Sequence, residues 1–201
     1  MFRIIMRMQC PYCHAPLAES SIECRHCNLS LKSANTLLGP APKLSNGIND
    51  LIALLDKKAH KKINKSLRKL AGHFPQVKMH IVINKFDSKY SLSTHLFWLF
   101  NQDSLSISNH KGGDNHNILL GLDPNHSTCG LMVGYGLEPF LARKALDHVI
   151  DVAHPLLSQG NIEYAISIII EELTQVMQET CIQLNEVFET SETKTSQSTE
   201  Y

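Results

Sequence analysis

Four cysteines near the start of the chain have the residue type and the spacing that bind a metal ion. Cys10 and Cys13 form one CxxC pair, and after ten intervening residues Cys24 and Cys27 form a second. Two such pairs can present four sulfurs to one point, and four thiolates in a tetrahedron are a preferred ligand set for Zn2+. A closed four-sulfur set leaves no open coordination position for a substrate, so the spacing predicts a structural zinc site and not a catalytic one.

The residues around the cysteines support this hypothesis. His14 and Asn28, which follow the two pairs, are of types enriched in left-handed backbone, a conformation that lets amide groups point at the sulfurs. The segment around the four cysteines is too short to bury enough apolar surface to fold alone. Metal binding must therefore supply its folding free energy. The alternatives are a redox-active CxxC, an iron centre of the rubredoxin type, or cysteines without a metal. Residues 8–32 resemble the zinc-ribbon family, whose members bind nucleic acid, bind proteins or brace a neighbouring domain.

Composition restricts the class of protein. The chain has 201 residues, 43% of them hydrophobic, which suffices for one sizeable core and a smaller attached module. Lysine plus arginine and aspartate plus glutamate are 19 each, so no global field drives the protein onto nucleic acid or an anionic membrane. No apolar run approaches the roughly 18 residues of a membrane-spanning helix. No secretory signal is recognisable either, so we expect a cytoplasmic protein without a transmembrane segment.

Positive charge gathers in one segment for which a helix is predicted. Apolar residues recur at near-helical intervals from Leu51 to Leu70, with Asp50 as the expected N-cap and Gly72 as the expected stop. The opposite side carries basic residues with no acid between them: Lys57, Lys58, Lys61, Lys62, Lys65, Arg68 and Lys69. Such a stripe can bind nucleic-acid phosphates. The alternative is a solvated face that keeps the helix soluble or contacts an acidic protein surface.

Strand and helix patterns alternate through the rest of the chain. Strands are predicted at 77–83, 105–108, 117–122 and 129–133, the last two as an antiparallel hairpin. Further helices are predicted at 91–101, from Pro139 to about 153, and at 161–187. Helices flanking a four-stranded mixed sheet give an α/β fold.

This pattern divides the chain into four parts. A zinc ribbon covers residues 1–32, a linker rich in Gly and Pro covers 33–47, the α/β domain covers 48–188, and a disordered polar tail covers 189–201. Cys129 and Cys181, outside the ribbon, are expected to be buried thiols.

Two motifs in the second half of the chain carry a family resemblance. They read Asp114-Asn115-His116-Asn117-Ile118-Leu119-Leu120 and, directly after the predicted hairpin, Val133-Gly134-Tyr135-Gly136-Leu137-Glu138. The chain from about residue 50 to 179 thereby resembles the TPM domain family, whose founding members include a thylakoid-lumen acid phosphatase. The resemblance implies an α/β/α sandwich. Some members of that family bind divalent cations such as calcium, some have been assigned phosphatase activity, and others assist the assembly or repair of membrane complexes.

Asp114 and Glu138 are the candidate oxygen ligands for a divalent cation, Ca2+ or Mg2+. Carboxylates at strand ends and at a helix start can converge above one edge of a sheet, and a cation held there could neutralise a phosphate and activate water. Each residue also has a structural explanation, because Glu138 suits the start of a helix and Asp114 lies in a polar loop.

Three functions are therefore predicted. The first is a cytoplasmic zinc-binding accessory or interaction protein, not an enzyme, whose TPM-like domain docks a protein partner. The second is a divalent-metal-dependent phosphoester hydrolase resembling an acid phosphatase. The third is nucleic-acid binding through the ribbon and the basic helix. The lack of a convincing catalytic set favours the first.

Overall fold

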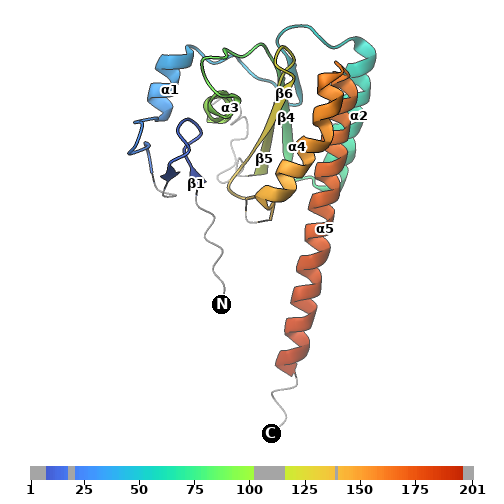
Figure 1. Ribbon diagram of the computed structural model, residues 1–201. Coiled ribbons are helices and arrows are strands. Elements are labelled where there is room, and N and C mark those ends of the chain that lie inside the picture. The colour runs from blue at the N-terminus through green and yellow to red at the C-terminus, as the bar shows by residue number, and fades with distance from the viewer. Residues whose placement is uncertain (1–7, 18–20, 102–115, 139, 197–201) are drawn as a thin grey trace.

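The centre of the fold is a four-stranded sheet with the order β3-β4-β5-β6 (Figure 1). The computed structural model describes residues 8–17, 21–101, 116–138 and 140–196, with the side chains of Met8 and of 186–196 excepted. Strands β3 (Ile48–Asp50), β4 (Lys78–Ile83) and β5 (Asn117–Asp123) are parallel, and β6 (Thr128–Val133) is antiparallel to β5. The predicted mixed sheet and hairpin are confirmed. The strand predicted at 105–108 lies outside the described residues.

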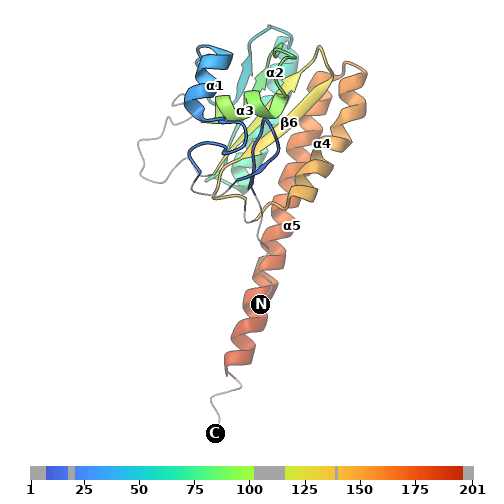
Figure 2. The same cartoon turned by 60° about the vertical axis from the view of Figure 1, so that its left-hand side comes forward.

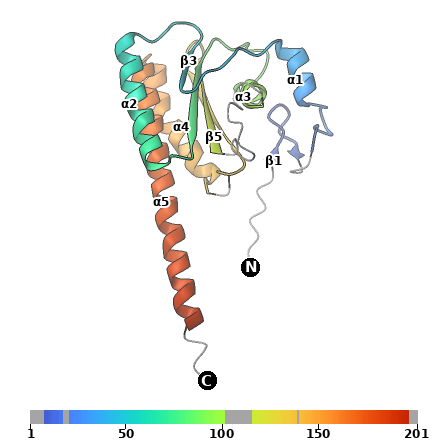
Figure 3. The same cartoon turned by 180° about the vertical axis from the view of Figure 1, so that it is seen from behind.

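Helices cover both faces of the sheet, which confirms the α/β/α sandwich. On one face lie α2 (Lys57–His73), α4 (Arg143–Ser158) and α5 (Ile162–Ser196). On the other lie α3 (Leu92–Phe100), α1 (Leu31–Leu38) and the four-cysteine segment (Figures 1 and 3). None of the described helices is both long enough and apolar enough to cross a membrane.

Alternate residues of the central strands build two cores. In β4, Met79, Ile81 and Ile83 pack against α2, α4 and α5. Val82 points to the opposite face and belongs to a second cluster with residues of α3. Because Cys10 and Cys24 belong to that same cluster, the cysteine segment is packed into the sandwich.

Two glycines let α3 approach the sheet closely. A Cβ on Gly121 of β5 would overlap Leu96 Cδ2, and one on Gly130 of β6 would lie 3.1 Å from Leu96 Cδ1. The two glycines are directly opposite each other in the β5–β6 ladder. Side chains there would push α3 outward, so the tight packing of the second core depends on these two positions.

Helix α2 begins later than predicted. Its N-cap is Asp56, whose carboxylate accepts the amide of Ala59 at 2.7 Å. The predicted cap at Asp50 is wrong, because Asp50 ends β3 and pairs with Ile83. Its carboxylate accepts the amide of Leu55 at 2.7 Å instead. The apolar residues before Asp56 fit a helical period, yet they form the turn that connects the strand to the helix.

Two other segments contain more helix than expected, and one helix is displaced. Part of the segment interpreted as a linker forms α1, which a capping box between Ser30 and Ser33 starts and which ends at Gly39. Helix α5 continues to Ser196, beyond the predicted end at 187, and projects from the sandwich (Figure 2). The residues up to 196 that we expected to be a disordered tail are therefore helical. Helix α4 begins at Arg143 and not at Pro139, which lies outside the described residues.

Candidate metal centre

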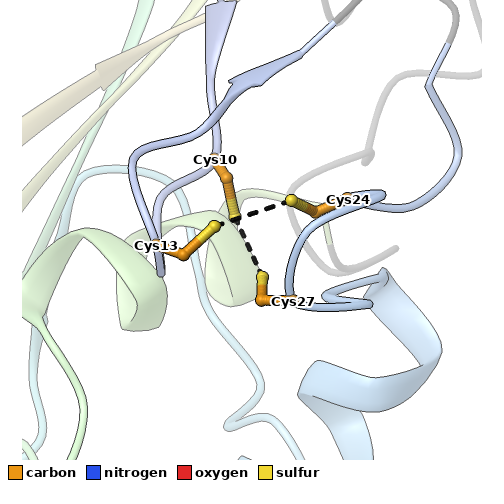
Figure 4. A group of neighbouring side chains, drawn as sticks. All are labelled: Cys10, Cys13, Cys24 and Cys27. Atoms are coloured by element: carbon orange, nitrogen blue, oxygen red, sulfur yellow. Dashed lines mark hydrogen bonds between the residues drawn. The ribbon is translucent and has the colours of Figure 1, made fainter.

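The four cysteines predicted as ligands lie together in the structure (Figure 4). Their sulfur atoms are all within 4.8 Å of one another, and the Cys10–Cys27 and Cys13–Cys24 sulfur pairs are each 3.6 Å apart. Zinc–sulfur bonds of about 2.3 Å in a tetrahedron place the sulfurs about 3.8 Å apart. The group therefore has the size that a single four-sulfur metal site requires. In the described parts of the chain it is the one group of three or more ligand residues that could hold a metal ion.

Two similar loops position the sulfurs. In the first, the amide of His14 donates to Cys10 O at 2.9 Å, and in the second the amide of Asn28 donates to Cys24 O at 2.7 Å. His14 has φ 59° and Asn28 has φ 56°, so the left-handed backbone expected after each CxxC pair is confirmed. Strands β1 (Met8–Gln9) and β2 (Pro16–Leu17) pair on either side of the first loop. Both loops thus have the same backbone hydrogen bond and the same left-handed residue after the CxxC pair.

Burial and backbone amides act differently on the thiols of Cys10, Cys24 and Cys27. The backbone amide of Cys27 is the main influence that lowers the pKa of Cys24 to about 6, and burial opposes it. Burial raises the pKa of Cys27 to about 12 and also raises that of Cys10. Cys24 therefore offers a thiolate at neutral pH, whereas Cys10 and Cys27 must release protons when a cation binds. Metal affinity should consequently fall as the pH falls.

The first loop is bonded to the start of α3. Pro11, between Cys10 and Cys13, accepts hydrogen bonds through its carbonyl from the hydroxyls of Ser91 at 3.1 Å, Ser93 at 2.9 Å and Thr94 at 3.2 Å. The metal site is thereby connected directly to a helix of the sandwich. Sequence reasoning missed this contact, because its acceptor is a backbone atom that any residue would provide.

The second predicted cation site is only partly described. Asp114 lies outside the described residues, so the structure does not place it next to Glu138. Glu138 is half-buried in the turn after β6, and its amide donates to Gly134 O at 3.2 Å. Because α4 begins only at Arg143, the predicted position of Glu138 at a helix start is wrong.

The predicted basic residues face different neighbours along α2. Lys62 forms an ion pair with Glu163 of α5 at 2.7 Å. Lys61 and Arg68 line a cleft on the β4 side of the helix, together with Lys78. All seven are exposed, and four besides Lys62 take no part in that cleft: Lys57, Lys58, Lys65 and Lys69. Sequence reasoning missed Lys78, whose position at the start of β4 gave no sign of its nearness to α2.

An apolar pocket lies between the turn after β6 and helix α5. Its volume is about 200 Å3, and its lining includes Leu137, Phe140 and Met177. Phe140 is 48% exposed and Tyr135, in the same turn, is 60% exposed. Cys181 also borders the pocket and is exposed, so its expected burial is wrong, whereas Cys129 is partly buried. The motif that contains Tyr135 carried the family resemblance, but its sequence did not indicate a pocket.

Comparisons with known proteins identify the fold. No known family and no curated protein sequence matches the chain. The N-terminal domain of the cg2496 protein from Corynebacterium glutamicum is similar in structure, with a TM-score of 0.52 and 13% identity over 69% of this chain and 84% of that one. The N-terminal domain of a protein from P. gingivalis is also similar, with a TM-score of 0.50 and 22% identity over 66% of this chain and 82% of that one. The BA42 protein from the psychrophilic bacterium Bizionia argentinensis has a TM-score of 0.55 and 14% identity over 65% of this chain and 86% of that one.

Fold and site together define a class of protein. The chain is an α/β/α sandwich domain with a four-cysteine group positioned to bind a metal ion. The similar structures have so little sequence identity to it that they show the fold alone. Membership of the TPM family therefore stays a prediction.

Proposed function

We propose that this protein is a zinc-binding, cytoplasmic accessory protein whose TPM-like domain docks a protein partner. The observation that carries the proposal is the apolar pocket lined by Phe140, an exposed aromatic side chain, with a second exposed aromatic, Tyr135, in the same turn. Aromatic side chains are enriched in protein interfaces, and the residues that dominate the binding energy cluster in well-packed pockets. An apolar side chain of the partner would fill the pocket.

The cysteine site supports an architectural role for the metal. Four thiolates complete a zinc coordination shell, so this ion would have no open position for a substrate. The contact of Pro11 with α3 indicates instead that the metal braces one face of the sandwich. Paired CxxC motifs with free thiols also suit a reducing compartment, which is the reason for placing the protein in the cytoplasm.

Substitution of Phe140 tests the docking surface. Tagged full-length protein, Phe140→Ser and the matched control Ile22→Ser are purified from native cells, and each copurifying protein is then re-examined with purified components. Ile22 is the suitable control because it is 91% exposed and lies in the cysteine segment, away from the pocket lining. The proposal expects a partner that binds the wild type and the control but not Phe140→Ser. It fails if every partner binds all three proteins equally, or if none binds the wild type.

The hydrolase predicted from the sequence is examined with the same preparations. A generic phosphate ester is offered with Ca2+ or Mg2+ across about pH 5–8, the range in which such carboxylate and water chemistry operates. If the protein is an accessory protein, it should not hydrolyse the phosphate ester with either metal ion. Turnover that Glu138→Ala abolishes would contradict it.

A further inference from the structure

A basic cleft lies between α2 and the start of β4. Its volume is about 480 Å3, within the range of small-molecule sites in proteins. Lys61, Asn64 and Arg68 of α2 line one side, and Lys78 lines the other. The cleft is distinct from the pocket beside Phe140, with which it shares no lining residue.

Helical spacing explains why these α2 residues share the cleft. Lys61, Asn64 and Arg68 follow one another at intervals of three and four residues, so they project from one side of the helix. Lys62 points away from this side and pairs with Glu163. Of the seven basic residues of α2, two therefore line this cleft, where Lys78 of β4 adds a third cation.

No acid neutralises these cations in the described part of the chain. The ion pairs found there are Lys62 with Glu163 and Asp123 with His126, and neither involves the cleft. Its lining contains no aspartate or glutamate. Three positive charges around one cavity repel one another, and an anion with several acceptor oxygens would relieve that repulsion while accepting hydrogen bonds from all three.

The rest of the lining indicates what kind of anion would fit. Leu67, Val77 and Met79 contribute apolar surface, and the amide of Asn64 can donate or accept hydrogen bonds. The lining contains no Phe, Tyr or Trp on which the bases of a single-stranded nucleic acid could stack. An open cleft that places cations beside apolar residues, without aromatic side chains for stacking, suits a small molecule better than a nucleic-acid strand.

We propose that this cleft binds a small phosphate ester. Lys61, Arg68 and Lys78 hold the phosphate, and the organic part lies against Leu67, Val77 and Met79. This site is independent of the proposed docking of a protein partner.

The test is a titration of the full chain followed by amide NMR shifts, with Gly47 in the cleft lining as a local reporter. The probes are inorganic phosphate, phenyl phosphate and a twelve-nucleotide oligouridylate. Phenyl phosphate should bind more tightly than inorganic phosphate, because only its ring can cover the apolar residues. Lys61→Ala/Arg68→Ala should weaken its binding by about tenfold or more, since two charge-assisted hydrogen bonds are lost.

Lys58→Ala/Lys69→Ala is the matched control, because it removes the same charge from exposed positions of the same helix outside the cleft. It should weaken binding by less than about twofold, as expected for screened surface charges. Equal losses in the two double variants would overturn the proposal, as would unchanged amide shifts with both phosphate probes. Oligouridylate that binds more tightly than phenyl phosphate would also overturn it and indicate a nucleic-acid surface. All variants should show unchanged thermal unfolding, since the substituted side chains are exposed.

Discussion

Removal of the metal should loosen α3 as well as the cysteine segment. The link is the carbonyl of Pro11, which the hydroxyls of Ser91, Ser93 and Thr94 contact. A carbonyl oxygen has two lone pairs, so three donors count as about two full hydrogen bonds, each worth about 0.5–1.5 kcal/mol net. Their loss would cost the sandwich about 1–3 kcal/mol. For a chain of this length that corresponds to a fall in Tm of about 2–12 °C.

Trp98 of α3 makes this effect measurable. It is the only tryptophan in the chain, it is 6% exposed, and its indole N–H donates to Asn35 of α1 at 2.8 Å. Fluorescence and thermal unfolding would be recorded before and after chelation, with metal loss verified by elemental analysis. A red-shifted emission maximum and a lower Tm are expected.

Ser93→Ala provides the control for that experiment. It removes one of the hydroxyls that contact Pro11, so chelation should lower its Tm by less than it lowers the Tm of the wild type. Unchanged emission and an unchanged Tm after verified loss of the metal would refute the reasoning, because the metal would then brace nothing beyond its own loops.

Three other predictions concern packing and thiol chemistry. Gly121→Ala should lower the free energy of unfolding by about 1–3 kcal/mol, because its Cβ would overlap Leu96. Gly130→Ala should lower that free energy by less, and equal shifts of the two variants in urea unfolding would contradict this. Asn49→Ala should cost about 1–3 kcal/mol in the same assay, because Asn49 Oδ1 accepts the Ser45 amide at 2.7 Å in a buried position, and an unchanged midpoint would count against it. Burial raises the pKa of Cys129 to about 11, so near pH 8 iodoacetamide should modify the exposed Cys181 before Cys129. The rate at Cys129 should increase as the pH rises. Equal rates at the two cysteines near pH 8 would disprove this.

Much of the architecture could be predicted because its signals are local. The alternation in β4, the hairpin of β5 and β6, and the helix between Ser91 and Asn101 all follow from short stretches of sequence. The cysteine group is local in the same sense. Two CxxC pairs with His14 and Asn28 behind them specify two similar loops, whose hydrogen bonds join residues close together in the sequence.

The missed features depend on contacts between distant segments. Strand β3 has three residues, too few to show an alternating pattern, and it exists because its residues pair with Ile81, Val82 and Ile83 of β4. That pairing also explains the wrong helix cap, since Asp50 has the residue type of a cap but lies in a strand. Lys78 joins Lys61 in the cleft only after β4 packs beside α2.

Metal analysis of protein purified under reducing conditions without chelators tests the central claim most directly. We predict one zinc ion per chain, and X-ray absorption should show four sulfur neighbours at about 2.3 Å. A metal-free protein with the same fold, or a zinc ion bound by nitrogen or oxygen in place of one of the four sulfurs, would contradict the account.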